Sequence, residues 1–380
     1  MTKLDAIKED TEIEQKRQQM YAALRELDAF GFWTIQGDME PRAPRVREVP
    51  HVWRWKDFEE HVMLAGEIVP HELADRRGII LHNPGLDMTK PATTNTQFVA
   101  YSVYMPGEVF HPHIHSPAAS RMLLKSDGKG YTTVEGEKAY LERGDLITTP
   151  SGTWHDHGNE GDVPMVWVDM LDIPVAMLFN AGKFGFDYTE NGVTREMQSP
   201  TRSQLYSQRH FAVGGVRPRF AEQVIGNDNG SPQLHFKYAD TRRALNAVRD
   251  EAGDPYDGVI VDYVNIMDGG PIQRTQNFSM QLLRPGEHTL SHRDTSSSVY
   301  VVIEGSGSTI INGQEYKWEE DDIFCVPTYM WHEHVNASNT EDAVIYCVSD
   351  APAVKKLGLY WEDRKDSQGN VTTIGKAIPA

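Results

Sequence analysis

The sequence lacks any apolar run long enough to cross a bilayer. A membrane-spanning helix needs about 18 consecutive apolar residues, and the 380-residue chain contains no such run. Its N-terminal segment is densely charged in both signs and has no apolar stretch typical of a signal peptide. We therefore expect no membrane partner and a cytoplasmic location.

Basic residues and cysteines are also scarce. The chain has 37 basic against 55 acidic side chains, a formal net charge of -18, which argues against nucleic acid or an anionic membrane as a partner. An anionic small substrate is still allowed, but it would need a locally positive pocket. The two cysteines, Cys325 and Cys347, lie in apolar runs, and we expect both to be buried, reduced thiols.

Histidine, in contrast, is concentrated in two short segments. One reads His-Pro-His-Ile-His and a later one reads Trp-His-Asp-His-Gly-Asn. Side chains alternate along a strand, so His113 and His115 share one face, and His155 and His157 also share a face. Two such strands inside a small barrel would direct three or four imidazoles to one point. Because neutral imidazole suits iron, copper, nickel or zinc, the sequence predicts a metal site.

The residues around these histidines follow the spacing of the two cupin motifs. Gly107 is followed after five residues by His113-x-His115, as in the first motif. The fixed positions of the second motif are occupied by Gly144, Pro150, Gly152, His155 and Asn159. This double match strengthens the prediction of a metal site inside a small β-barrel.

The pattern of apolar and turn residues agrees with a β-barrel. From Thr96 onward, short β-like runs alternate with turn residues, as in a small antiparallel barrel or jelly roll. Strands are predicted at residues 98–105, 121–124, 131–134, 138–141, 146–150 and 163–171. Helices are predicted at residues 3–29, 55–66, 70–77 and 241–250.

The same pattern returns in the second half of the chain. Pro285-Gly286-Glu287 repeats Pro106-Gly107-Glu108, and residues 327–336 repeat residues 150–159. An internal duplication of this kind predicts two barrels in one chain. The fold class is therefore mainly β, a bicupin with an N-terminal helical collar. The expected divisions are a collar at 1–85, barrels at 86–180 and 256–350, a linker with a helix at 181–255 and a tail at 351–380.

The two halves differ at the positions that matter for metal binding. In the second half, His292-Arg293-Asp294 replaces His-x-His, and Tyr300 stands at the position of Arg121. His292, Asp294 and His332 are the right ligand types for a weak second metal site. Alternatively, these residues no longer bind a metal and only pack inside the barrel.

Several further segments give the first half a closer resemblance. They are Val52-Trp53-Arg54-Trp55, Arg76-Arg77, Asn83-Pro84-Gly85-Leu86, Ala92-Thr93-Thr94-Asn95-Thr96 and the run from Trp154 to Asn159. Together they resemble the gentisate 1,2-dioxygenase family, which includes the salicylate-type and 1-hydroxy-2-naphthoate dioxygenases. The resemblance is strong over residues 30–175 and looser over the second barrel.

The resemblance implies an oxidoreductase of aromatic hydrocarbon catabolism, often a homotetramer. Such an enzyme uses Fe(II) to insert both atoms of O2 into a 2-hydroxybenzoate, between the carboxyl- and hydroxyl-bearing carbons. By this resemblance His113, His115 and His155 ligate iron. Residues 118–120 read Ala-Ala-Ser and supply no carboxylate. The iron would therefore keep its full charge and have open positions for substrate and O2.

The resemblance also suggests which residues contact the substrate. Arg121 is expected to bind the substrate carboxylate by a charge-assisted fork, with Arg77 as a second candidate. His157 would hydrogen-bond the substrate or act as a general acid or base.

One residue departs from the family pattern and widens the range of substrates. Ser102 stands where the family usually has glutamine, and a smaller residue removes an amide contact and opens the pocket. A substituted salicylate or 1-hydroxy-2-naphthoate is therefore an alternative to gentisate. Two other classes also remain open: a metal-dependent cupin isomerase or decarboxylase, and a non-catalytic binding bicupin.

Overall fold

The computed structural model describes residues 11–70, 73–74, 76–200, 206–211, 219 and 230–375. The chain divides into two compact units, Met1–Arg45 and Val46–Ala380. The first unit contains the helices α2 (Thr11–Glu26) and α3 (Phe32–Met39). All of the predicted strands lie in the second unit.

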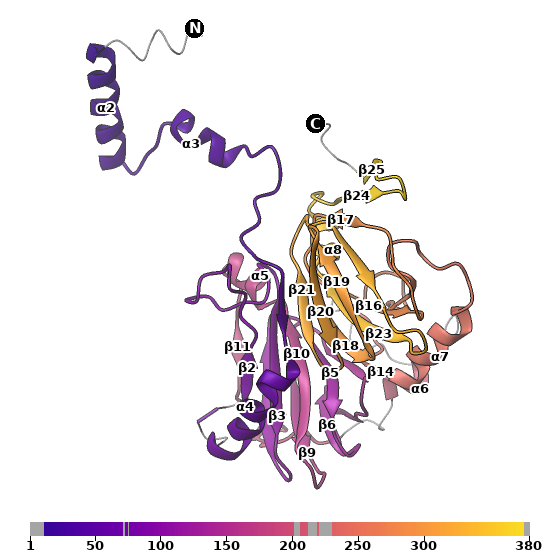
Figure 1. Ribbon diagram of the computed structural model, residues 1–380. Coiled ribbons are helices and arrows are strands. Elements are labelled where there is room, and N and C mark those ends of the chain that lie inside the picture. The colour runs from indigo at the N-terminus through magenta and orange to yellow at the C-terminus, as the bar shows by residue number, and fades with distance from the viewer. Residues whose placement is uncertain are drawn as a thin grey trace. The chain divides into compact units, whose positions relative to one another are not determined.

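The second unit consists of two β-barrels that lie side by side (Figure 1). The first barrel is built from β2 (Gly78–Ile80), β3 (Phe98–Tyr104), β4 (Val109–His115), β5 (Ala119–Lys125), β6 (Gly130–Val134), β7 (Glu137–Tyr140), β8 (Leu146–Thr149), β9 (His155–Asn159), β10 (Met165–Leu171), β11 (Phe184–Gly185) and β14 (His235–Phe236). The second is built from β1 (His51–Trp53), β15 (Val259–Asp262), β16 (Asn277–Leu283), β17 (His292–Asp294), β18 (Ser298–Glu304), β19 (Ser306–Ile311), β20 (Gln314–Glu319), β21 (Ile323–Val326), β22 (His332–Val335), β23 (Ala343–Ser349), β24 (Trp361–Lys365) and β25 (Val371–Gly375).

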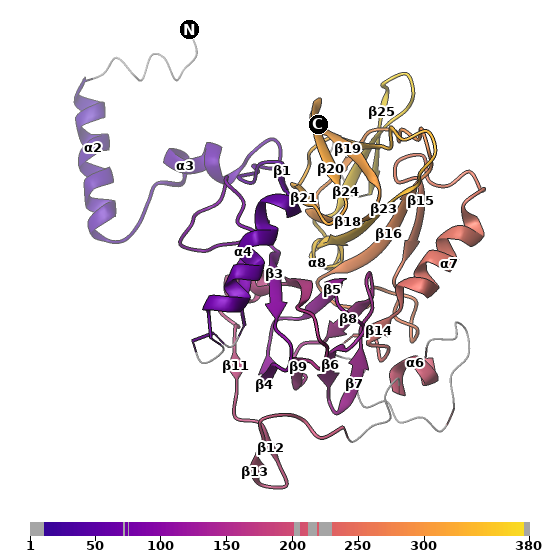
Figure 2. The same cartoon turned by 60° about the horizontal axis from the view of Figure 1, so that its bottom comes forward.

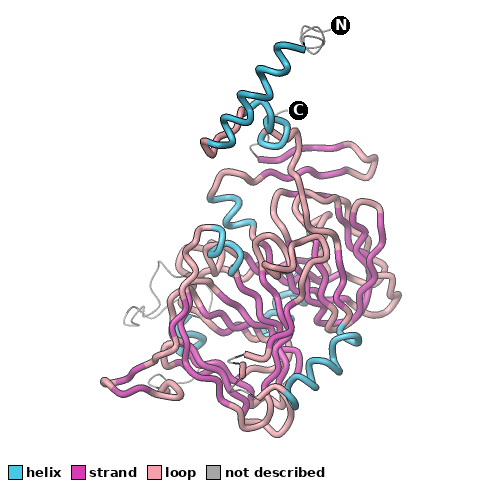
Figure 3. The backbone as a smooth tube through the Cα atoms, turned by 90° about the vertical axis from the view of Figure 1, so that its left-hand side faces the viewer, coloured by secondary structure: helices cyan, strands magenta, loops and turns pink. Residues whose placement is uncertain are grey.

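The sheet topology confirms the predicted duplication. The order β14-β8-β5-β10-β3-β2 in the first barrel corresponds strand by strand to β1-β21-β18-β23-β16-β15 in the second. The facing sheets also correspond strand by strand when the first is read from its other edge, as β7-β6-β9-β4-β11 against β20-β19-β22-β17-β24, with β25 as one additional strand in the second barrel. Strands dominate both barrels (Figure 3), and the fold is a bicupin, as expected.

The N-terminal and linker segments contribute strands as well as helices. β1 pairs with β21 of the second barrel, whereas β2 pairs with β3 of the first. β14, from the linker, pairs with β8 and closes the edge of the first barrel. The tail folds back onto the second barrel, because β24 pairs with β17. A small hairpin of β12 (Thr189–Glu190) and β13 (Val193–Thr194) follows the first barrel.

The helices agree with the sequence in most places. The helices predicted at 55–66 and 241–250 are confirmed as α4 (Trp55–Ile68) and α7 (Tyr238–Val248), the latter beside β15 and β16 (Figure 2). The helix predicted at 3–29 is confirmed in part by α2; residues 1–10 lie outside the described residues. The helix predicted at 70–77 is wrong for its described residues, which form turns and irregular backbone. The described residues also form the short helices α5 (Ile173–Leu178), α6 (Tyr206–Phe211) and α8 (Ala351–Lys356).

Two further observations concern the described residues. Cys325 and Cys347 are both buried and unpaired, as predicted. None of the described helices is long and apolar enough to span a bilayer.

Two buried aspartates join the barrels reciprocally. Asp350, which follows β23, accepts hydrogen bonds from Thr96 Oγ1 of the first barrel at 2.6 Å and from the backbone N–H of Ser297 at 2.8 Å. Its counterpart Asp172, which follows β10, accepts a hydrogen bond from Thr275 of the second barrel. Each barrel thus donates one threonine hydroxyl to a buried carboxylate of the other.

Asp350 predicts a pH-dependent stability. Burial raises its pKa to about 7, against about 3.9 in an unfolded chain. The folded state therefore holds the proton of Asp350 more tightly than the unfolded state does. The stability that this protonation contributes is fully present below about pH 4 and is lost as the pH rises towards 7. Asn at this position keeps the shape and cannot ionise. When the pH is raised from 5 to 8, we expect the unfolding temperature of Asp350→Asn to fall less than that of the parent protein. The unfolding temperature is measured by circular dichroism.

The matched control is Asp162→Asn, because that side chain is 90% exposed. It should behave like the parent protein at both pH values. An identical pH dependence in the parent protein and Asp350→Asn would show that the carboxyl does not titrate in this range.

Candidate metal centre

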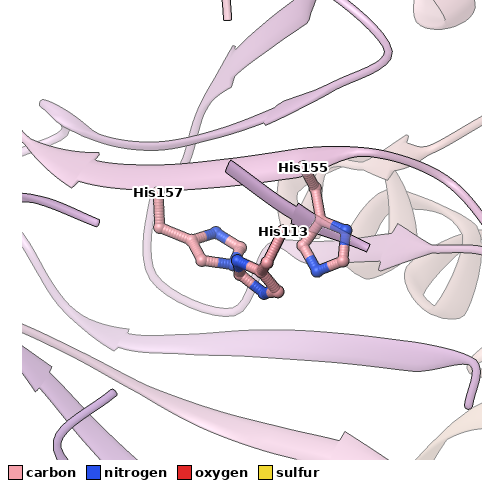
Figure 4. Close-up of side chains that lie close together, drawn as sticks. All are labelled: His113, His155 and His157. Atoms are coloured by element: carbon pink, nitrogen blue, oxygen red, sulfur yellow. The ribbon is translucent and has the colours of Figure 1, made fainter. Parts of the chain in front are cut away.

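Strands β4 and β9 bring the predicted histidines together in the first barrel. They are antiparallel neighbours, and His113 lies opposite His155 in their register. All four imidazoles are buried, with His113, His115, His155 and His157 at most 3% exposed. The rings of three of them, His113, His155 and His157, point toward one another in Figure 4. The alternation of side chains along two strands therefore produces the expected cluster.

Each imidazole presents a nitrogen without a hydrogen-bond partner. Nε2 of His113, His115, His155 and His157 is buried and has no hydrogen-bond partner in the described part of the chain. In the first three residues, Nδ1 lies 3.1, 2.7 and 2.9 Å from a backbone carbonyl oxygen. A carbonyl only accepts, so Nδ1 carries the proton and Nε2 presents a lone pair. The three acceptors are the carbonyls of His111, Pro117 and Thr153.

His157 differs from the other three. Its Nδ1 lies 3.0 Å from Thr132 Oγ1, a hydroxyl that either donates or accepts. The hydrogen bond therefore does not dictate which nitrogen of His157 carries the proton. Its ring lies against Trp167, with 5.1 Å between the ring centroids.

Two geometric criteria select different third ligands. Potential ligand atoms of His113, His155 and His157 all lie within 4.8 Å of one another. His115 is outside that group, although its ring centroid is 4.7 Å from that of His155. The contact between Nδ1 and a backbone carbonyl, in contrast, is shared by His113, His115 and His155. A backbone acceptor fixes the tautomer of a histidine, whereas a small rotation of the ring is enough to change the separation of two nitrogens.

The histidines are held in their neutral form. Burial lowers the pKa of His113, His155 and His157 well below the usual range, and that of His115 to about 3. The positive charge of Arg76 adds to this effect on His113 and His115. Neutral imidazoles with unpaired nitrogens are the form that a divalent ion such as Fe(II), Zn(II) or Cu(II) binds. The residues present therefore fit a metal ion.

Arg121 lies beside the histidines and is fully buried. Its Nε lies 2.8 Å from Asp169 Oδ1, and its Nη1 donates to Thr149 Oγ1 at 3.0 Å. Its Nη2, in contrast, has no hydrogen-bond partner among the described residues. One edge of the guanidinium is therefore held in place while one nitrogen remains available to an anion.

Ser102 belongs to the network that holds Arg121. Its hydroxyl donates to Asp169 Oδ2 at 2.6 Å, and Trp167 Nε1 donates to the same oxygen at 3.0 Å. Asp169 thus connects Ser102, Trp167 and Arg121, a connection that sequence reasoning missed because Asp169 lies on β10, outside both motifs.

The structure places Arg77 and its neighbour Arg76 differently. Arg77 Nη1 donates to the carbonyls of Gly66 and Val69 at the end of α4, at 2.9 and 3.2 Å, and Nη2 pairs with Glu108. The guanidinium of Arg76 instead lies 6.0 Å from the ring centroid of Phe184. The Phe184 ring is in turn 5.3 Å from that of His115. The sequence pointed to Arg76-Arg77 as a pair, but only the structure shows that Arg76 is the one on the side of the histidines.

A buried tyrosine was also missed. Tyr104 is fully buried, and its hydroxyl has no hydrogen-bond partner among the described residues. Its ring centroid is 6.0 Å from that of His157. Tyr104 lies at the end of β3 within an apolar run, so its sequence context gives no signal of a polar role.

The second predicted ligand set lies in the second barrel. His292 and His332 are again register partners, on β17 and β22. The carboxylate of Asp294, however, accepts hydrogen bonds from the backbone N–H and the hydroxyl of Ser296.

Comparison with known proteins agrees with this architecture. The cupin domain model matches residues 100–172 and again residues 279–349. The 5-aminosalicylate 1,2-dioxygenase of Comamonas sp is 35% identical over 343 residues, 89% of this chain and 87% of that protein. The gentisate 1,2-dioxygenase 1 of Aquipseudomonas alcaligenes is 32% identical over 93% of this chain and 97% of its own.

Solved structures show the same likeness. The salicylate 1,2-dioxygenase of Pseudoaminobacter salicylatoxidans, solved as an adduct with gentisate, superimposes with a TM-score of 0.82 at 28% identity. The match covers 93% of this chain and 94% of that one. Because identity, coverage and fold all agree over nearly the whole length, the chain belongs to the gentisate 1,2-dioxygenase family of bicupin aromatic ring-cleavage enzymes.

Proposed function

We propose that this protein is an Fe(II)-dependent dioxygenase that cleaves the ring of a 5-substituted 2-hydroxybenzoate. Cleavage falls between the carboxyl- and hydroxyl-bearing carbons, and both atoms of O2 enter the product. The observation that carries the proposal is the cluster of four buried, neutral imidazoles near Arg121, since within the described part of the chain neither their Nε2 atoms nor Arg121 Nη2 has a hydrogen-bond partner. The relatives named for 5-aminosalicylate and gentisate support this class of substrate.

His113, His115 and His155 are the proposed iron ligands. Their Nδ1 protons are held by backbone carbonyls, which orients each ring and leaves Nε2 free to bind. Three neutral ligands do not reduce the charge of the ion, so the ion retains its attraction for an anionic substrate. Bound Fe(II) would supply the redox chemistry and would ease ionisation of the substrate phenol.

The two arginines, Arg121 and Arg76, are the proposed site for the substrate carboxylate. Arg121 is pre-oriented by Asp169, so it loses little conformational freedom when it binds an anion. Arg76 adds a second positive charge near the histidines. Together they provide the locally positive site that an anion needs in a chain of net charge -18. Arg77, committed to carbonyl oxygens and Glu108, is assigned a structural role.

His157 is the proposed acid–base group. Thr132 accepts or donates at its Nδ1, so Nε2 is able either to donate a hydrogen bond to the substrate or to take its phenolic proton. Ser102 is proposed to act on the substrate indirectly, since its hydroxyl is occupied by Asp169. Without the longer glutamine side chain, this position leaves room beside the ring and favours a substituted salicylate.

O2 uptake by anaerobically prepared, Fe(II)-loaded protein tests the reaction. We expect uptake with 5-aminosalicylate and other 5-substituted salicylates, and none with catechol, which lacks the carboxylate that the arginines bind. A higher rate with 1-hydroxy-2-naphthoate would select that alternative substrate. Iron-loaded protein that consumes no O2 with any of them would favour a non-oxygenase cupin or a binding bicupin. The homotetramer that the resemblance implies and the cytoplasmic location expected from the N-terminal segment stay predictions.

The ligand assignment is tested by comparing His115→Ala with His157→Ala. We expect His115→Ala to lose tightly bound iron, because one of three ligands is removed, and His157→Ala to keep the iron but to lose most of its turnover. Iron content by plasma mass spectrometry separates the two variants. The reverse result would make His113, His155 and His157 the ligands, in agreement with the nitrogen distances.

The arginine assignment is tested by comparing Arg76→Met with Arg77→Met. A lost charge-assisted hydrogen bond costs about 1.5–3 kcal/mol, so Arg76→Met should lower kcat/KM roughly 10- to 100-fold for salicylates. Arg77→Met should lower the unfolding temperature, because it leaves carbonyls and Glu108 unpaired, but change kcat/KM little. Equal losses of kcat/KM in both variants would contradict the assignment.

A further inference from the structure

The second barrel encloses a polar cavity of its own. The cavity has a volume of about 390 Å³. It is lined from both sheets, with Gln281 and Tyr300 on one side and His292, His332 and Glu362 on the other. A cavity lined by polar side chains needs a polar occupant, because apolar contents would leave the lining groups unpaired.

Two of the lining histidines repeat the geometry of the first barrel. His292 lies opposite His332 in the strand register, as His113 lies opposite His155. The ring centroids are 4.3 Å apart in this pair and 4.1 Å apart in the first. His332 Nδ1 lies 3.1 Å from the carbonyl of Met330, so its Nε2 presents a lone pair. Both histidines are at least nine-tenths buried, with 7% and 6% exposed.

His292 is oriented by a carboxylate on its far side. Its Nδ1 lies 3.3 Å from Glu362 Oε1, on the tail strand β24. Its Nε2 is buried and has no hydrogen-bond partner among the described residues. A carboxylate that accepts from one ring nitrogen while the other nitrogen faces a cavity is the usual environment of a histidine that binds metal.

A second carboxylate lies where a further ligand is needed. Asp257 Oδ1 is 3.8 Å from His292 Nε2, too far for a hydrogen bond. Two atoms bound to one ion at about 2.1 Å stand roughly 3.0–3.5 Å apart, so a small movement would let both bind one ion. Gln281 Nε2 donates to the same Asp257 oxygen at 2.7 Å and holds the side chain at the cavity.

We propose that His292, His332 and Asp257 form a second metal site, for a divalent first-row transition ion, in the second barrel. Two imidazoles and one carboxylate are a ligand set that such ions accept with further positions open. Glu362 supports His292 from behind. Asp257 takes the place that the sequence suggested for Asp294, whose carboxylate is bound to Ser296.

The charges around the two sites differ in a way that fits this proposal. Beside the first site lie Arg121 and its partner Asp169. At the equivalent positions the second barrel has Tyr300 and Cys347, opposite each other in the sheet register. The second site therefore has no arginine at that position, and the carboxylates of Asp257 and Glu362 would offset the charge of the ion. Arg364 also lines the cavity, but it is paired with Glu362 at 2.6 Å. The proposed site is therefore independent of the proposed reaction.

Metal binding must bring the ligand atoms of His292, His332 and Asp257 closer together than they are without metal. Among the described residues, the one group of three whose ligand atoms all lie within 4.8 Å is that of the first barrel. A side-chain rotation of Asp257, whose side chain is 27% exposed, is the simplest way to close the second set. We therefore expect weaker binding at the second site than at the first.

Co(II) binding to the chelator-treated full-length protein tests the proposal. Co(II) stoichiometry is read by equilibrium dialysis with mass spectrometry, and the ligand field by the visible absorption of the ion. We expect two Co(II) per chain in the parent protein and one in each of His292→Ala, His332→Ala and His113→Ala. Glu362→Gln should bind the second ion about 10- to 100-fold more weakly.

The matched control is His288→Ala. This histidine precedes β17 in the second barrel, but it is half exposed and contacts Glu333 at 3.2 Å; its removal should leave two ions bound. One Co(II) in the parent protein, or a second ion that survives in both His292→Ala and Asp257→Asn, would overturn the proposal. His292→Ala should still bind the first Co(II) and, when loaded with Fe(II) instead, should still consume O2, so failure of the second site and failure of the proposed reaction are distinguishable.

Discussion

The first barrel buries four imidazoles whose Nε2 atoms have no hydrogen-bond partner among the residues that the structure describes. Each unsatisfied buried polar group costs about 1–3 kcal/mol, and four in one place destabilise the barrel interior unless something binds them. A divalent cation satisfies this requirement, because it replaces the missing partners of several nitrogens at once. Since the ion would bind the folded chain and not the unfolded one, the stability of the first barrel should be linked to metal binding.

The duplicated scaffold shows how one fold supports two different electrostatic environments. The strand register that pairs His113 with His155 also pairs His292 with His332, so the geometry of the cluster follows from the barrel itself. What differs is a small number of side chains beside it. Where the first barrel has an arginine held by Asp169, the second has Tyr300 and a thiol. The buried side chains beside the histidines, more than the histidines themselves, therefore distinguish the two barrels.

Hydrogen bonds beside a shared apolar core join the two barrels. Asp172 and Asp350 are buried, and each accepts a hydrogen bond from a threonine of the other barrel. The segments that border the sites come from distant parts of the chain: β1 completes the second barrel, and β24 supports His292 through Glu362. The barrels are thus joined to each other, and residues far from His292 in sequence contribute to how that side chain is held.

The sequence by itself determined the two barrels, most strands and the identity of the clustered histidines. These follow from local rules: alternation along a strand, turn residues between strands, and a repeat visible at His292 and His332. Tertiary structure alone decided which arginine faces the cluster, since Arg76 and Arg77 are adjacent and point in different directions. It also decided the partners of Arg121 and His292, namely Asp169 and Glu362, because those contacts join strands whose spacing along the chain carries no periodic signal. Local periodicity thus predicts the face on which a side chain lies, whereas the partner it meets there depends on how distant strands pack.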